Sequence, residues 1–315
     1  MNLYRAGITG IGVALPEKRL TNHDLEKMVD TSDEWIVTRT GIRERRIVTD
    51  GERTSDLATR AAERALLDAG VAAEQLDMII VASVTPDLTF PPTACLVQER
   101  IGASKAACFD LEATCSGFVY GVSVAAQFIM TGAYQKVLVI GAETLSTITD
   151  YTDRNTCVLF GDGAGAAVIE RVPEEFGILS FELGADGSGA ELLKREHTAA
   201  IEMNGREVFK FATRTMGEAA KRVMNKAGWE SQDVNLLVPH QANVRIIEEA
   251  RRRTGLKEEQ VYVNIHKYGN TSSATIPIAL REALDEGRLK TGDRVVLVAF
   301  GGGMTWAAMA LVWGK

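Results

Sequence analysis

Short apolar runs alternate with longer amphipathic stretches along the chain. The short runs are rich in β-branched residues and predict strands at Ala6–Val13, Met78–Val84, Ala107–Leu111, Lys136–Ile140, Ala164–Ile169, Asn235–Val238 and Arg294–Ala299. The longer stretches predict helices at Ser55–Asp68, Gly117–Met130, Thr213–Lys226 and Ser273–Glu286. Strands that alternate with helices in this way are typical of an α/β fold.

Parts of this pattern occur twice, in the same order. In both Gly70–Met78 and Gly228–Leu236, a helix ends at the glycine, a polar turn follows, and an apolar strand begins. Further on, Lys136–Gly141 resembles Arg294–Ala299. A glycine-bearing strand region then closes each half, at Gly161–Ile169 and Gly301–Val312. Repetition of two pairs in one order indicates an internal duplication.

The boundary between the two copies is predicted near the polar, proline-containing stretch Arg171–Glu175. The chain has 315 residues, of which 46% are hydrophobic, and this suffices for about two domains or two halves of one large domain. We therefore expect an N-terminal half at residues 1–171 and a C-terminal half at residues 172–315.

Charge and cysteine usage narrow the function classes. The formal net charge is -7, from 35 basic and 42 acidic side chains, which gives no electrostatic basis for non-specific nucleic-acid binding. The four cysteines form no CxxC pair and have no histidine at zinc-ligand spacing. We expect no metal site, a reducing cytoplasmic compartment, and at most one functional thiol.

No targeting or membrane segment is evident in the sequence. The N-terminus shows no basic region followed by an apolar stretch and a small-residue cleavage site, so no secretory signal is expected. The longest mostly apolar stretch, Gly117–Met130, is shorter than the roughly 20 residues that a transmembrane helix needs. It is interpreted as a buried helix, and no membrane association is expected.

Cys115 is the strongest candidate nucleophile. It stands between the predicted strand Ala107–Leu111 and the predicted helix that begins at Gly117. At a helix N-terminus, unpaired N–H groups and the helix dipole favour a thiolate. Ser116 and Gly117 permit a tight turn and a close approach of substrate. A buried structural cysteine is the alternative, and it is the interpretation we give to the other three cysteines.

Two further polar positions follow predicted strands or open predicted helices. His240 ends the strand Asn235–Val238, a common location for functional groups in α/β sheets. Asn270 lies in a turn that opens the helix Ser273–Glu286, where helix capping alone could explain it. Gly301–Gly303 follows another strand and suggests a backbone N–H at an oxyanion site, or a plain turn. Together Cys115, His240 and Asn270 form a candidate nucleophilic site.

These residues carry a specific resemblance over essentially the whole chain. The chain resembles the β-ketoacyl-[acyl carrier protein] synthase III family in the segments Thr31–Ile36, Thr38–Arg43, the Cys115 region, Leu159–Ala166, Pro239–Asn243, Gly269–Ser272 and Phe300–Gly303. The resemblance implies a thiolase-like fold with duplicated halves in a five-layered αβαβα arrangement. It also implies a homodimer that acts on acyl-coenzyme A and malonyl-[acyl carrier protein] without a cofactor.

The resemblance also implies roles for individual residues. Cys115 would accept the acyl group, His240 and Asn270 would hold the malonyl thioester carbonyl during decarboxylation, and the N–H groups of Cys115 and Gly302 would form an oxyanion hole. The positions that match binding residues of the family are Trp35, Arg39 and Arg154 for the nucleotide end of coenzyme A, Asn243 for its pantetheine arm, Phe90 for the partner's acyl pocket, and Arg245 for the carrier protein. Arg206 departs from the family pattern, in which Asn can stand there, so its contact with coenzyme A stays open.

Four alternatives remain for comparison. A papain-like cysteine hydrolase shares the Cys/His/Asn set but has another signature around its cysteine. A thiolase needs a second cysteine near the C-terminus, and none follows Cys157. A hydroxymethylglutaryl-coenzyme A synthase-like enzyme is a further relative of this kind. A non-enzymatic binding module would leave Cys115 no more reactive than Cys95. The starter acyl group, acetyl or short branched, stays open.

Overall fold

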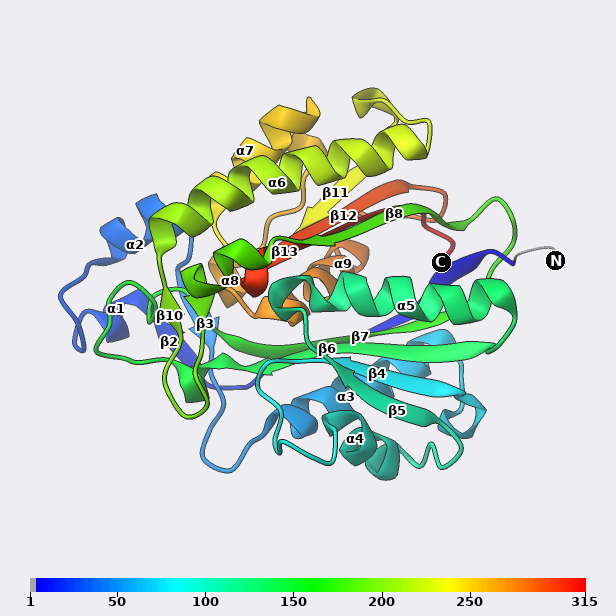
Figure 1. The fold of residues 1–315 in the computed structure, drawn as a ribbon, viewed down its shortest axis with the longest axis horizontal. Coiled ribbons are helices and arrows are strands. Elements are labelled where there is room, and N and C mark those ends of the chain that lie inside the picture. Colours follow the sequence, from blue (N-terminus) through cyan, green and yellow to red (C-terminus); the bar gives the residue numbers. More distant parts are fainter. Residues whose placement is uncertain (1–3) are drawn as a thin grey trace.

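The computed structural model describes residues 4–315 and shows five layers (Figure 1). Two β-sheets lie on either side of a central layer of helices, and further helices cover the outer face of each sheet. The central layer consists of α5 (Gly117–Thr131) and α9 (Thr275–Asp285). The prediction of a five-layered αβαβα arrangement is therefore confirmed.

The first sheet has five strands in the order β1-β7-β6-β4-β5. Its strands are β1 (Ala6–Ala14), β7 (Asp162–Arg171), β6 (Lys136–Thr144), β4 (Met78–Ala82) and β5 (Ala107–Leu111). The strands β6, β4 and β5 are parallel, whereas β7 runs antiparallel to β6 and to β1. Its outer face is covered by α3 (Thr54–Ala69) and α4 (Thr93–Ile101).

The second sheet repeats this topology with the strands of the C-terminal part of the chain. Its order is β8-β13-β12-β11, with β8 (Gly177–Ala185), β13 (Thr305–Val312), β12 (Arg294–Gly301) and β11 (Leu236–Pro239). Here β11 and β12 are parallel, and β13 is antiparallel to both β12 and β8. A parallel bridge from Leu237 to Val261 lies where β5 pairs in the first sheet. The outer face carries α6 (Gly205–Lys226) and α7 (Val244–Thr254).

The remaining elements are short and lie between the main ones. They are β2 (Arg19–Thr21), α1 (Asn22–Leu25), α2 (Asp33–Thr40), β3 (Glu44–Arg46), β9 (Leu193–Lys194), β10 (Glu202–Met203) and α8 (Ile265–Tyr268), together with single 3₁₀ turns. Two of these turns matter below. We call Thr114–Ser116 the cysteine turn and Ser272–Ala274 the serine turn, and each leads into a helix of the central layer.

Matched strand orders confirm the duplication that the sequence predicts. The same offset in sequence separates Gly70 from Gly228 and Cys115 from Ser273, so the cysteine turn and the serine turn are equivalent positions of the two copies. Both turns begin at a residue with positive φ. The boundary at residues 171 and 172 stays a prediction, and it falls between β7 and β8.

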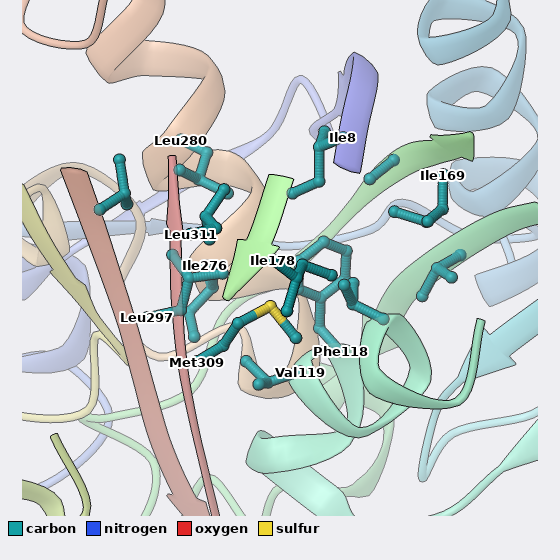
Figure 2. Packing of buried hydrophobic residues seen from close by; sticks show 14 of the residues in the cluster. Ile8, Phe118, Val119, Ile169, Ile178, Ile276, Leu280, Leu297, Met309 and Leu311 are labelled. Carbon is teal, nitrogen blue, oxygen red and sulfur yellow. The ribbon is translucent and has the colours of Figure 1, made fainter. Parts of the chain in front are cut away.

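The main hydrophobic core lies between the two sheets (Figure 2). Phe118 and Val119 of α5 face Leu297 and Met309 of the second sheet. From α9, Ile276 and Leu280 enter the same cluster. Because both central helices are packed between sheets, residues at their N-termini are held in fixed positions. This packing places the cysteine turn and the serine turn beside each other in the interior.

Several predicted boundaries differ from the observed ones. Helix α6 starts at Gly205, eight residues before the predicted start, because Asn204 caps it through a hydrogen bond to the N–H of Glu207. The strand β8 and the helix α4 were not predicted, since β8 is only partly buried and α4 is short. The stretch Thr114–Thr131 is long and apolar enough to span a membrane by composition alone, yet it includes α5 and lies between the sheets.

Candidate active site

Cys115 lies where the first sheet meets the central layer. The chain leaves β5, forms the cysteine turn, and enters α5 at Gly117. Thr114 has a φ of 46°, a left-handed conformation that costs free energy and is common at functional turns. A Cβ at Gly117 would lie 2.9 Å from the Cβ of Ala82, so this helix start fits closely against β4 only as glycine.

The pKa of the Cys115 thiol corrects the expectation that this residue is a thiolate at rest. Burial raises this pKa to about 12, although the nearby side chains of Ser272 and Asn270 and the backbone N–H of Cys115 act in the opposite direction. The helix N-terminus by itself would favour the thiolate. Because the sulfur is buried, desolvation of the charged form outweighs that effect. The resting nucleophile is therefore a thiol that must lose its proton before it attacks.

His240 is buried at the end of β11 and is neutral. Its Nδ1 lies 2.7 Å from the hydroxyl of Thr275, while its Nε2 has no hydrogen-bond partner among the described residues. Burial lowers the pKa of His240 to about 3. When the Thr275 hydroxyl donates to Nδ1, Nε2 carries the hydrogen and faces the site as a neutral donor.

Asn270 is oriented by the serine turn that follows it. Its side-chain oxygen accepts a hydrogen bond from the N–H of Ser272 at 2.8 Å. The amide nitrogen is thereby left to face the Cys115 thiol, whose pKa it helps to lower. The carbonyl oxygen of Ser272 lies 3.1 Å from the Thr275 hydroxyl, whose single hydrogen goes to Nδ1 of His240 in the tautomer described above and not to this carbonyl. One turn therefore contacts both Asn270 and the partner of His240.

The three predicted residues come together around the thiol. Cys115, His240 and Asn270 line one narrow cavity of about 90 Å³, together with Phe300 and Asn243. On its other side Cys115 lines a larger cavity of about 990 Å³. Apolar side chains contribute much of its wall, among them Phe109, Leu111, Leu145, Ile148, Leu193 and Ile201. We call the narrow cavity the passage, and Cys115 lines both it and the wider, largely apolar cavity.

The end of β12 approaches the cysteine turn closely. A Cβ at Gly301 would lie 1.9 Å from the Thr114 hydroxyl oxygen and 2.8 Å from the backbone nitrogen of Cys115. The next residue, Gly302, accepts a hydrogen bond from that hydroxyl at 3.3 Å and lines the larger cavity beside Cys115. The backbone of Gly302 therefore borders the position where an oxyanion hole is predicted.

We expect Gly301→Ala to slow acylation of Cys115 by about 10²-fold, because the added methyl group displaces the turn that carries the nucleophile and its N–H. The φ of Gly301 is -157°, so the backbone itself accepts alanine and the effect is steric. Acyl adduct formation followed by intact-mass spectrometry measures the rate. Gly187→Ala, which meets no atom within 4 Å, is the control, and equal rates for the two variants would contradict the argument.

Residues predicted to bind the nucleotide end of coenzyme A also lie together. The guanidinium carbons of Arg39 and Arg154 lie 4.8 Å and 4.5 Å from the ring centroid of Trp35. Arg154 lies 3.5 Å from Asp30 as well. Two cations stacked on one partly exposed indole provide an aromatic surface with positive charge beside it.

Asn243 and Arg245 lie at the start of α7. Asn243 caps this helix by accepting from the N–H of Arg245 at 2.9 Å, and it donates to the carbonyl of Arg39 at 2.9 Å. Its amide is thus largely engaged by the protein. The guanidinium carbon of Arg245 lies 5.1 Å from the ring centroid of Phe209, which lines the narrow cavity.

Positions away from the thiol complete the predicted set. Phe90 is 82% exposed and does not line the larger cavity of its own chain, although its neighbour Thr89 does. Arg206 is exposed near the start of α6. Among residues 4–315 no cluster of three or more His, Cys, Asp or Glu side chains could hold a metal ion.

Sequence reasoning missed three residues that support the site. Thr275 pairs with His240, Ser272 orients Asn270, and the buried carboxyl of Glu143 lies beneath the serine turn. Glu143 could have been found, because a lone acid directly after the apolar run of β6 is unusual. Nothing in the sequence pattern distinguishes Ser272 and Thr275 from ordinary helix-start residues.

Known proteins match this chain in sequence over most of its length. Residues 109–187 match the family model described as 3-oxoacyl-[acyl-carrier-protein] synthase III, and residues 224–313 match the model of its C-terminal part. The β-ketoacyl-[acyl-carrier-protein] synthase III of Geobacillus kaustophilus is 59% identical over 310 residues, which cover 98% of this chain and 99% of the relative.

Solved structures of the same kind superpose over nearly the whole chain. The 3-oxoacyl-[acyl-carrier-protein] synthase III of Aquifex aeolicus has a TM-score of 0.96 at 51% identity, with 98% of this chain and 100% of that chain covered. The synthase III of Thermus thermophilus has a TM-score of 0.95 at 52% identity, with 98% and 99% covered. By sequence and by structure, the chain belongs to the 3-oxoacyl-[acyl-carrier-protein] synthase III family, whose thiolase-like fold it shares.

Proposed function

We propose that the chain starts fatty-acid synthesis by condensing a short acyl-coenzyme A with malonyl-[acyl carrier protein]. The products are a β-ketoacyl-[acyl carrier protein], coenzyme A and carbon dioxide. The observation that carries this proposal is the placement of Cys115 between two cavities, with His240 and Asn270 on the narrow side. An acyl chain can occupy the wide apolar side while thioesters arrive through the passage.

In the first half-reaction the Cys115 sulfur attacks the acyl thioester carbonyl and coenzyme A leaves as its thiol. The N–H groups of Cys115 and Gly302 stabilise the negative oxygen that forms on the way. The acyl group then remains on the enzyme as a cysteine thioester. A covalent intermediate of this kind divides the reaction into two steps and predicts ping-pong kinetics.

In the second half-reaction the malonyl thioester carbonyl accepts hydrogen bonds from Nε2–H of His240 and from the amide of Asn270. Loss of carbon dioxide leaves an enolate, whose negative oxygen these two neutral donors stabilise. The enolate carbon attacks the acyl carbonyl, the Cys115 thiolate leaves, and it takes up from solvent the one proton that the overall reaction consumes. The low pKa of His240, about 3, keeps it neutral throughout this sequence.

The binding residues follow the same scheme. Trp35 with Arg39 and Arg154 binds the nucleotide end of coenzyme A, and Asn243 borders the pantetheine arm in the narrow passage. Both substrates are thioesters that supply their own leaving groups, and the scheme uses no cofactor. The free cysteines are compatible with a reducing cytoplasm.

We further propose a homodimer that forms along β5. This strand lies at the edge of the first sheet and its residues are partly exposed, and an unpaired edge is a template for a second strand. Phe90, on the loop before α4, is 82% exposed and in a dimer would enter the larger cavity of the partner subunit.

The proposal is tested by supplying acetyl-, isobutyryl- and isovaleryl-coenzyme A in competition and detecting acyl-enzyme by mass. Malonyl-[acyl carrier protein] is then added and carbon dioxide release is measured. We expect one acyl adduct per chain and release of carbon dioxide that depends on it. An adduct that malonyl-[acyl carrier protein] does not discharge would refute condensation. The adduct that dominates identifies the starter.

Arg245→Glu should raise the apparent KM for malonyl-[acyl carrier protein] several-fold and leave acylation by acyl-coenzyme A nearly unchanged. Carrier proteins of this pathway are acidic as a family, so a negative charge in place of Arg245 should oppose their docking. This effect should become smaller as the salt concentration rises. Steady-state kinetics at two salt concentrations measure the effect. Equal losses in both half-reactions would assign Arg245 to the fold instead.

Arg252→Glu is the matched control on the same helix. Arg251, Arg252 and Arg253 form ion pairs with Glu248 or Glu249, as expected for a solvated helix face. Exposed pairs of this kind contribute little to stability. A larger effect at Arg252 than at Arg245 would place the docking surface farther along α7.

A further inference from the structure

Glu143 is a buried carboxyl whose function the condensation scheme leaves unexplained. It lies at the end of β6, is fully buried, and has no cation paired with it among the described residues. Two residues earlier, a Cβ at Gly141 would lie 2.4 Å from the carbonyl oxygen of Ser273. Glycine at that position lets β6 approach the serine turn, and alternate residues of a strand share a face, so Glu143 faces the same turn.

The two carboxyl oxygens have different surroundings. Oε2 accepts hydrogen bonds from the N–H of Val84 at 3.0 Å and from the hydroxyls of Thr85 and Ser83 at 2.8 Å and 3.2 Å. Oε1 has the hydroxyl of Ser273 at 3.2 Å, but that hydroxyl also contacts the carbonyl of Ala82 at 2.9 Å. Since one hydroxyl has one hydrogen, Oε1 retains capacity to take up a proton.

Ser272 lies near both the nucleophile and this carboxyl, because Ser272 and Cys115 line the same cavity and the next residue, Ser273, contacts the carboxyl. The Ser272 hydroxyl is buried and makes no hydrogen bond within the described part of the chain, yet it is near enough to lower the pKa of both Cys115 and Glu143. Ser272 has a φ of 49°, which is a strained conformation for serine. An unpaired buried hydroxyl in a strained turn is costly unless it has a use.

The proposed mechanism needs a group that accepts the proton of the Cys115 thiol. Nε2 of His240 must already carry a hydrogen to donate to the malonyl carbonyl, and burial disfavours the imidazolium. The Cys115 thiol is protonated at rest, and His240 is thus a poor acceptor for its proton. Burial raises the pKa of Glu143 to about 7, so its carboxyl exchanges a proton near neutral pH.

We propose that Glu143, acting through the hydroxyl of Ser272, takes up the proton of the Cys115 thiol when acylation begins. The thiol proton moves to Oγ of Ser272 while the hydroxyl proton moves to Oε1 of Glu143. The thiolate attacks the acyl carbonyl, the bond to the sulfur of coenzyme A breaks, and the proton returns by the same route to the departing thiolate. Net charge in the interior stays constant, which avoids the burial of a second charge.

Few groups near Glu143 could exchange a proton with it in place of Cys115. From the loop after β4, Ser83, Val84 and Thr85 face the carboxyl, and from the serine turn Ser272 and Ser273 face it, all of them uncharged. The titratable neighbour is Cys115, whose pKa the charge of Glu143 raises. If Glu143 acted only through this charge, its removal would make the Cys115 thiol more reactive, whereas removal of a proton acceptor would make it less reactive.

Alkylation of Cys115 by iodoacetamide, followed by peptide mass mapping across pH 5.5 to 9, tests the inference. We expect Glu143→Gln and Ser272→Ala to slow alkylation at pH 7.5 by about 10²-fold, as for loss of a general base. The rise of the rate near pH 7 should disappear as well. Asp162→Asn is the control, because this carboxyl is also buried, has a pKa of about 6 and contacts Ser146 and Val48 instead.

Two other results would overturn the inference. Faster alkylation in Glu143→Gln would mean that the carboxylate only repels the thiolate. An unchanged pH profile with lower thermal stability would mean that Glu143 only supports the fold. The inference rests on the proposed function, but alkylation needs no acyl-coenzyme A. A failure of acyl transfer with every starter would refute the proposed function without changing this readout.

Discussion

Cys115→Ser is expected to abolish the acyl adduct and to lower the rate of condensation by about 10⁴-fold or more, in line with the loss of other covalent nucleophiles. Serine has nearly the size of cysteine, so the cysteine turn and α5 should retain their packing. Its hydroxyl, however, has a far higher pKa than the thiol, and burial at this position opposes ionisation further. The altered group therefore fills the site without reacting.

Intact-mass spectrometry after incubation with acyl-coenzyme A provides the measurement. The unaltered chain should gain one acyl mass and the variant none. Cys95→Ser serves as the control, because Cys95 is half-buried on α4 and lines neither cavity at the thiol. An adduct that persists in Cys115→Ser would assign the nucleophile to another residue and would remove the basis of the proposed function.

The fold and the central three residues could be predicted because their signals are local or repeated. Uniform apolar runs such as β6 and β12 mark buried strands, and their recurrence at one spacing shows the duplication. Cys115 and His240 stand at strand ends, where α/β folds place functional groups. Element ends were harder to predict, since α6 depends on the single capping residue Asn204.

The supporting groups and the protonation states could not be predicted in this way. Ser272 and Thr275 become significant only because the serine turn packs beside the cysteine turn, which lies far away in sequence. The pKa of Cys115 depends on burial, which a local pattern does not reveal, so a helix N-terminus alone suggested the wrong resting state. Only the first of the two copies carries a nucleophile. In the second copy Ser273 occupies the place that corresponds to Cys115, and its hydroxyl contacts the Ala82 carbonyl and the Glu143 carboxyl instead.

His240→Ala and Asn270→Ala are each expected to keep the acyl adduct and to lower carbon dioxide release from malonyl-[acyl carrier protein] by about 10²–10³-fold. This is the usual effect of removing one donor to a developing oxyanion. Both side chains face the narrow cavity, and neither is needed for the attack of the thiol if Glu143 takes its proton. The two half-reactions thus depend on different residues.

Pulse labelling separates the two steps: the acyl-enzyme is trapped, excess acyl-coenzyme A is removed, and carbon dioxide release is then followed. In the unaltered chain this second step should show no inflection between pH 5.5 and 8, because His240 has a pKa of about 3 and stays neutral over that range. An ionisable histidine at its usual pKa would instead change its charge near pH 6.5. If either variant fails to form the adduct, its residue also acts in acylation. Such a failure in His240→Ala would make His240, rather than Glu143, the acceptor of the thiol proton.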